Sequence, residues 1–151
     1  SMTDLSQYPE ELHEILEIIN ESSTSERHEL LLDYSDRFQG VPEHIATRPY
    51  PESHRVVECE SDVYVFTEKA DNGGINFYIA VENPQGVSSR ALSAILSESF
   101  NGASLETIER IPETLVFELF GRNVSMGKGA GMMGIIRLLK HFARQTYQGD
   151  K

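Results

Sequence analysis

The sequence predicts a single α+β domain in which a small antiparallel sheet is covered by helices. Two amphipathic helical segments come first, two strand-like runs joined by a hairpin signal follow, and helical patterns then continue to the C-terminal region. At 151 residues the chain can bury one sizeable core, so it needs neither a metal ion nor a disulfide to fold.

The first two helices are expected on the N-terminal side of a proline-rich segment. Residues 9–21 place their apolar side chains on one stripe and their glutamates opposite. The second helix begins where Ser23 stands three residues ahead of Glu26, which is the spacing of a capping box, and it ends by Gly40. Residues 41–53 contain three prolines, which exclude a long helix or a central strand, so they form a connecting segment.

Two strands are expected in residues 59–70 and 74–82, and helices fill the rest of the chain. Asn72-Gly73 between the strands is a strong hairpin signal, so the strands should be antiparallel neighbours. Helical patterns then occupy residues 87–102, 104–111 and 112–121.

A last, long amphipathic helix is expected in the later part of residues 123–147, after the glycine-rich stretch MGKGAGMMG. This stretch does not fit a phosphate-binding P-loop, because Lys128 comes too early and no strand precedes it. We interpret its glycines as positions of close backbone packing ahead of the helix.

Composition and charge limit the classes of function. The formal net charge of −11 argues against nucleic acid as a partner, and no stretch approaches the roughly 20 apolar residues of a membrane span. The N-terminal residues show no secretory pattern and the single cysteine excludes an internal disulfide, so a reduced, cytoplasmic setting is expected.

The charge is unevenly distributed along the chain. Residues 1–22 hold acids and no Lys or Arg, whereas residues 122–151 hold six of the thirteen basic residues. Two interpretations remain open: neighbouring or solvated helix faces, and electrostatic steering toward a protein partner.

Cys59, the only cysteine, is the candidate reactive residue. It lies between Glu58 and Glu60 where the connecting segment meets the first strand, and these charged neighbours predict a partly exposed thiol. The alternative is a small buried hydrophobic residue. Two adjacent carboxylates should raise the pKa of the thiol, so a nucleophilic Cys59 needs cations nearby. The candidate cations are His54, Arg55 and Lys128, or groups of a docked partner.

Two other chemistries have weaker support. A cysteine–histidine hydrolase needs an oriented base, and none of the five histidines stands in a known nucleophile signature. One cysteine with scattered histidines lacks the spacing of zinc ligands, so no metal site is expected.

The segment HRVVECESDVYVF resembles the cysteine motif of the SufE/CsdE sulfur-acceptor proteins, whose typical form is N-R-V-x-G-C-x-S-x-V-W. The matching residues are Arg55, Val56, Cys59, Ser61 and Val63. Segments before and after the motif are similar in order and spacing, so the resemblance covers about residues 28–147. Residues 1–22 then form an additional acidic helix in one domain of residues 1–151.

Two departures mark a divergent member. Glu58 stands where glycine usually precedes the cysteine, and Lys128 stands where arginine is usual near the last helix. Lysine keeps the positive charge but loses the planar fork of arginine.

The resemblance implies a fold shared with IscU-type scaffolds and a role in iron–sulfur cluster biogenesis. Members take persulfide sulfur from a pyridoxal-phosphate cysteine desulfurase of the SufS/CsdA type, stimulate that enzyme and pass the sulfur to an assembly scaffold. By this resemblance Cys59 would form Cys59–S–SH, and Lys128, Arg55 and His54 would contact the partner. The pyridoxal phosphate belongs to the desulfurase, so no cofactor is expected here. The rival interpretation is a regulator that docks to a desulfurase without carrying sulfur.

Overall fold

The computed structural model describes residues 8–149; residues 1–7, which include the acidic Asp4, and residues 150–151 lie outside the described part. The elements in chain order are α1 (Glu10–Glu21), α2 (Thr24–Asp36), a short 3₁₀ helix η2 (Glu52–His54), β1 (Val63–Lys69), β2 (Ile75–Val81), α3 (Val87–Phe100), α4 (Leu105–Glu109), α5 (Leu115–Phe120) and α6 (Met126–Gly149). The predicted α+β class is confirmed.

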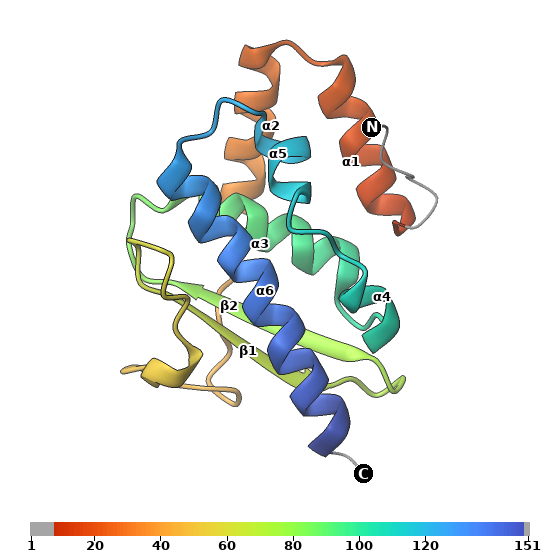
Figure 1. Cartoon of the computed structure of the whole chain (residues 1–151), viewed down its shortest axis with the longest axis vertical. Coiled ribbons are helices and arrows are strands. Elements are labelled where there is room, and N and C mark those ends of the chain that lie inside the picture. The colour runs from red at the N-terminus through yellow and green to blue at the C-terminus, as the bar shows by residue number, and fades with distance from the viewer. Residues whose placement is uncertain (1–7, 150–151) are drawn as a thin grey trace.

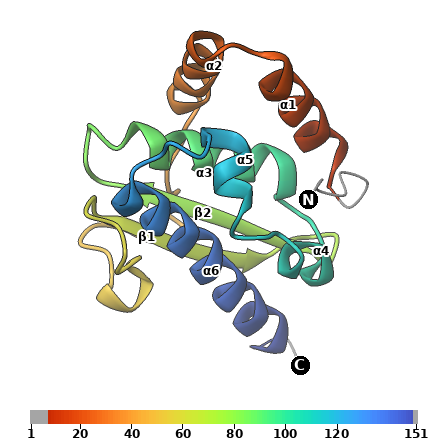
Figure 2. The same cartoon turned by 45° about the horizontal axis from the view of Figure 1, so that its top comes forward.

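Helices α1 and α2 lie at one end of the molecule and diverge from the turn that joins them (Figures 1 and 2), and α2 packs on α3. The apolar stripe of α1 is buried as expected, and α1 packs against α3 and α5. Helix α2 starts with the predicted capping box, because Ser23 accepts a hydrogen bond from the Glu26 backbone and the Glu26 carboxylate accepts one from the Ser23 N–H. It ends at Asp36, earlier than residue 40, and the following Phe38 is partly buried against the core.

Strands β1 and β2 pair antiparallel in the register Val63↔Val81 to Lys69↔Ile75, as the hairpin signal predicted. Gly73 takes a positive φ of 87°, and the Asn72 side chain accepts a hydrogen bond from the Gly74 N–H at 2.8 Å. The side chains of each strand therefore point alternately to two faces of the sheet.

The two faces of the sheet are covered differently. Val63 and Val65, with Val81 and Ile79 opposite, join the main core beneath the helices, where α6 packs on β1 and α3 on β2 (Figure 1). The other face carries Tyr64, Phe66 and Ala80, against which the proline-rich segment packs Val41, Ile45, Ala46 and Tyr50. Burial on both faces explains why β1 reads as a continuous apolar run.

Helix α6 corrects one expectation. The glycine-rich stretch lies inside the helix and not ahead of it, because the helix already starts at Met126. Ser125 precedes it, and its hydroxyl accepts a hydrogen bond from the Lys128 N–H at 3.2 Å, which is the geometry of an N-cap. The helix continues over 24 residues and buries Met132, Ile135, Ile136 and Leu139.

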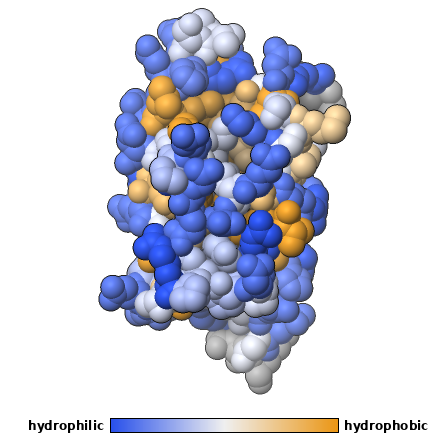
Figure 3. Space-filling view, turned by 90° about the vertical axis from the view of Figure 1, so that its left-hand side faces the viewer, coloured by the Kyte–Doolittle hydropathy of each residue, from blue (hydrophilic) through white to orange (hydrophobic). Residues whose placement is uncertain are grey.

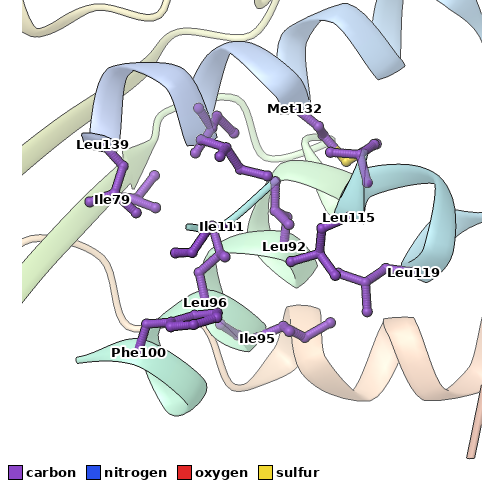
Figure 4. Close-up of a cluster of buried hydrophobic side chains, with 14 of the residues drawn as sticks. Ile79, Leu92, Ile95, Leu96, Phe100, Ile111, Leu115, Leu119, Met132 and Leu139 are labelled. Carbon is purple, nitrogen blue, oxygen red and sulfur yellow. The ribbon is translucent and has the colours of Figure 1, made fainter. Parts of the chain in front are cut away.

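The core between α3, α5, α6 and β2 is built from aliphatic side chains and Phe100, as Figure 4 shows. Among residues 8–149, the ion pairs of α6 join it to acids of neighbouring segments and not to the acids of α1. Arg137 bonds Glu113 at 2.6 Å, and Arg144 lies 3.9 Å from Glu109. Within residues 8–149, no helix combines the length and the apolar character needed to cross a bilayer.

Candidate functional site

Cys59 lies on a short loop, residues 55–62, that joins η2 to β1. Two buried valines hold the ends of this loop, Val56 at 2% and Val63 at 0% exposure. The Val56 N–H donates to the Val63 carbonyl at 2.8 Å, and the Cys59 N–H donates to the Val56 carbonyl at 3.1 Å. This tight turn directs the Cys59 side chain inward, toward α6.

The loop rests on a face of α6 that has no side chains. A Cβ atom at Gly131 would lie 3.0 Å from Cys59 Sγ and 3.4 Å from its Cα. A Cβ atom at Gly134, one turn further, would overlap the Glu58 carboxylate and lie 2.9 Å from a Val56 methyl group. The interpretation of these glycines as positions of close packing therefore holds, and what packs on them is the cysteine loop.

The expectation that Cys59 is partly exposed is wrong, because its residue exposure is only 6%. The charged neighbours do not report the position of the thiol, since the turn sends the Cys59 side chain inward while Glu60 stays exposed. The thiol is nevertheless next to open space. It lines a cavity of about 370 Å³ with hydroxyl groups, charged groups, glycines and one methionine on its other walls: Glu60, Ser61, Ser88, Ser89, Ser125, Gly127, Lys128, Gly131 and Met132.

Burial raises the pKa of the Cys59 thiol to about 11, with a smaller increase from the negative charge of Glu58. The positive charge of Arg55 and a hydrogen bond with the Ser89 side chain act in the opposite direction but do not compensate. At pH 7 only about one molecule in ten thousand then carries the thiolate, which is the nucleophilic form. In this conformation the thiol is held neutral.

Glu58 ties the loop to the surface of α6. Its carboxylate accepts a hydrogen bond from Arg137 Nη1 at 3.2 Å, and the same guanidinium donates to Glu113 at 2.6 and 3.3 Å. This Glu58–Arg137–Glu113 network is largely exposed, so its contribution to stability is about 0–1 kcal/mol. The buried valines and the backbone hydrogen bonds of the turn therefore contribute more to the position of the loop than this network does.

The structure brings two of the three predicted cations toward Cys59. Lys128 lines the cysteine cavity from the first turn of α6. Arg55 is the first residue of the loop, and its Nε lies 3.5 Å from an oxygen of the Asp62 carboxylate. The positive charge of Arg55 acts to lower the pKa of the thiol. Whether either residue binds a partner stays a prediction.

His54 lies outside the cysteine cavity, contrary to the expectation that it supplies a cation to the thiol. Its ring is stacked between Phe66 and Phe142, with centroids 4.5 and 4.4 Å away. Its Nδ1 lies 2.8 Å from the Val65 carbonyl, which only accepts hydrogen bonds, so Nδ1 carries the proton. Its role toward a partner stays a prediction.

Several site residues were missed by the sequence reasoning. Ser88, Ser89 and Ser125 supply the hydroxyl groups around the thiol, and Arg137 holds Glu58. Ser125 was recognisable as a cap, because it stands three residues before the Lys128 N–H that it binds. The other three carry no local signal. In residues 8–149, no group of three or more His, Cys, Asp or Glu side chains is placed to hold a metal ion.

Comparison with known proteins gives a family and a fold. Residues 13–143 match the family model described as SufE, an Fe-S metabolism associated domain, and the match starts within α1, before residue 28. The solution structure of a hypothetical protein from Thermus thermophilus superimposes with a TM-score of 0.72 at 21% sequence identity, covering 93% of this chain and 98% of the other. At that identity the likeness shows the fold alone. No curated protein matches the sequence.

We expect the alkylation of Cys59 by iodoacetamide to be slow at pH 7 and to accelerate about tenfold per pH unit up to about pH 10. The reason is the raised pKa, which delays formation of the thiolate as the pH increases. The measurement is the rate of mass gain between pH 6 and 11, with the urea-unfolded chain as the reference. A profile of the folded protein that levels off near 8.5 would contradict a thiol held neutral by burial.

Glu58→Gln should accelerate this alkylation roughly threefold at pH 8, because it removes a negative charge beside the thiol and weakens the bond to Arg137. Glutamine keeps the shape that fits over Gly134. Glu60→Gln is the matched control and should change the rate little, although it removes the same charge on the other side of Cys59. Equal rates for both variants would remove Glu58 from this role.

Gly131→Ala should lower the free energy of unfolding by about 1–2 kcal/mol relative to Gly127→Ala, because the new methyl group lies 3.0 Å from the sulfur and the cysteine loop must shift by a few tenths of an ångström. Gly127→Ala, in the same helix, meets no atom within 4 Å and should be neutral or stabilise by up to about 1 kcal/mol. Urea unfolding of both variants gives the comparison. If Gly131→Ala were as stable as Gly127→Ala, the loop would not rest on the helix as described.

Proposed function

This chain belongs to the SufE family, and we propose that within iron–sulfur metabolism it acts as a sulfur acceptor whose reactive group is the Cys59 thiol. Cys59 takes sulfur from the persulfide of a cysteine desulfurase of the SufS/CsdA type. The protein stimulates that enzyme and passes the sulfur to an iron–sulfur assembly scaffold. The pyridoxal phosphate stays with the desulfurase. The expected setting is cytoplasmic.

The observation that carries the proposal is the position of the only thiol in the chain. It lies on the wall of a cavity lined by hydroxyl groups and Lys128, beneath a surface loop, in a domain of the SufE family. A cysteine that served only to fill the core would not need open space with hydroxyl groups and an ammonium group beside its sulfur.

The transfer is a thiol exchange at sulfane sulfur. The Cys59 thiolate attacks the outer sulfur of the desulfurase persulfide, a new S–S bond forms on Cys59, and the old S–S bond breaks. The desulfurase cysteine leaves as a thiolate, and the proton of the transferred S–H stays with the sulfur. The step therefore conserves both atoms and electrons.

The closed conformation requires the desulfurase to activate the thiol. Cys59 is 6% exposed and its pKa is about 11, so solvent alone provides neither access nor ionisation. Docking that separates Glu58 from Arg137 and moves residues 57–61 off the α6 glycines would remove both obstacles. Such a thiol resists stray oxidants while the protein is free and reacts only in the complex.

A regulator that stimulates a desulfurase without carrying sulfur is the second candidate. The low reactivity of the buried thiol favours it, because a docking protein needs no nucleophile. The two candidates differ in what happens at Cys59 during turnover.

The test is incubation with the cognate desulfurase and free cysteine, followed by intact-mass analysis. A sulfur acceptor gains about 32 Da, one sulfur atom, and Cys59→Ser abolishes the gain. Cys59→Ser should also lose most of the stimulation of desulfurase turnover. A serine variant that stimulates as well as the wild type, together with no mass gain in the wild type, would establish the regulator instead.

A further inference from the structure

A second groove, of about 560 Å³, runs alongside the cysteine cavity. It lies between α2, the N-terminal turn of α3 and the segment that leads from α5 into α6. The two hollows share Ser88, Ser125 and Lys128 as common walls, so the groove opens directly beside the candidate site.

The groove has a charge opposite to that of the whole chain. Arg27, His28 and Lys128 line it, and in the described part of the chain no Asp or Glu contributes to its wall. The charge of this lining is thus opposite to the composition of the whole chain, which holds 24 acidic residues against 13 Lys and Arg. Glu26, adjacent to Arg27, is turned away and bonded to Ser23.

One of these cations is left incompletely satisfied. The Nε atom of Arg27 is buried and has no hydrogen-bond partner among the described residues. The Arg27 guanidinium packs against Gly121, where a side chain would collide with it. A buried donor without an acceptor is unusual in a folded protein. A carboxylate brought into the groove would offset the positive charge of this guanidinium.

The remaining wall is apolar and partly open to solvent. Leu32 and Val87 are 39% and 37% exposed, although both are aliphatic, and Leu31, Ala91 and Phe120 lie deeper. Figure 3 shows apolar surface in the upper part of the molecule, at the level of α2. Beyond the groove, Met126 at the start of α6 is 91% exposed.

We propose that this groove binds a segment of the sulfur-donating desulfurase in which carboxylate side chains flank apolar ones. The inference rests on the proposed function and specifies the chemistry of its partner. The apolar side chains cover Leu32 and Val87, and the carboxylates face Arg27 and Lys128. Because Lys128 borders both hollows, a partner seated here has its active site beside the cysteine loop.

The test uses the cognate desulfurase as the probe and three variants of the full chain. Leu32→Glu places a negative charge in the groove, and Leu32→Lys removes the same apolar side chain but adds a positive charge. Ile18→Glu is the matched control, because Ile18 is an aliphatic residue of α1 that is 52% exposed and does not line the groove. Both positions are at the surface, so circular dichroism should show native folding of all three variants.

We expect Leu32→Glu to weaken desulfurase binding at least about tenfold, Leu32→Lys to weaken it clearly less, and Ile18→Glu to leave it within about twofold. A photo-crosslinking side chain at position 32 should capture a desulfurase peptide that contains Asp or Glu. Equal binding by Leu32→Glu and wild type, or equal losses for Leu32→Glu and Leu32→Lys, would overturn the proposal.

Two readouts separate this proposal from others. The slow alkylation of Cys59 by iodoacetamide at pH 10, where more of the thiolate forms without a docked protein, should be the same in all variants. If wild type binds the desulfurase but never gains sulfur from it, the acceptor function fails while the groove proposal stands. If light scattering shows a dimer that Leu32→Glu or Ile18→Glu dissociates, the occupant is the acidic α1 of a second copy and the groove proposal is wrong.

Discussion

The packing of the cysteine loop on the glycine face of α6 is the contact on which the site depends. Gly131 and Gly134 are one turn apart and leave room for Cys59 and Glu58 respectively. Glycine inside a helix costs about 1 kcal/mol relative to alanine, and this stretch contains several. The cost is offset further along, where α6 buries an unbroken aliphatic face against β1, α3 and α5. The glycines of α6 thus form the site, and its buried apolar residues between Met132 and Ala143 supply the stability.

Glu58 is explained by the same contact. A large acidic residue before the cysteine is tolerated because Gly134 provides the space and Arg137 provides the charge one turn later. Glu113 in turn orients Arg137. A residue that would suit the loop poorly by itself is therefore accommodated by three others. Its charge also keeps the neighbouring thiol neutral, so the residue that closes the loop suppresses the reactivity beneath it.

The parts of this fold that sequence could predict are those set by local signals. The capping box of α2, the stripe of α1 and the Asn72-Gly73 hairpin each act within a few residues, and each was found. The burial of Cys59 could not be predicted in that way. Glu58 and Glu60 indicate exposure locally, but the contact between loop and helix joins residues more than 70 positions apart and decides the burial. The start of α6 did have a local signal, the Ser125 cap, but the glycines that follow it indicated a break in the helix.

Electrostatics at the site is governed by near neighbours and not by the net charge. At physiological salt the screening length is about 8 Å, so most of the 24 acids act weakly on the groove beside α2, whereas Arg27 and Lys128 act directly. In the proposed complex this groove attracts carboxylates of the partner, although the chain as a whole carries a net charge of −11. The groove adjoins the cavity of the only thiol. If the groove binds the desulfurase as proposed, the contact that selects the partner also brings its active site to Cys59.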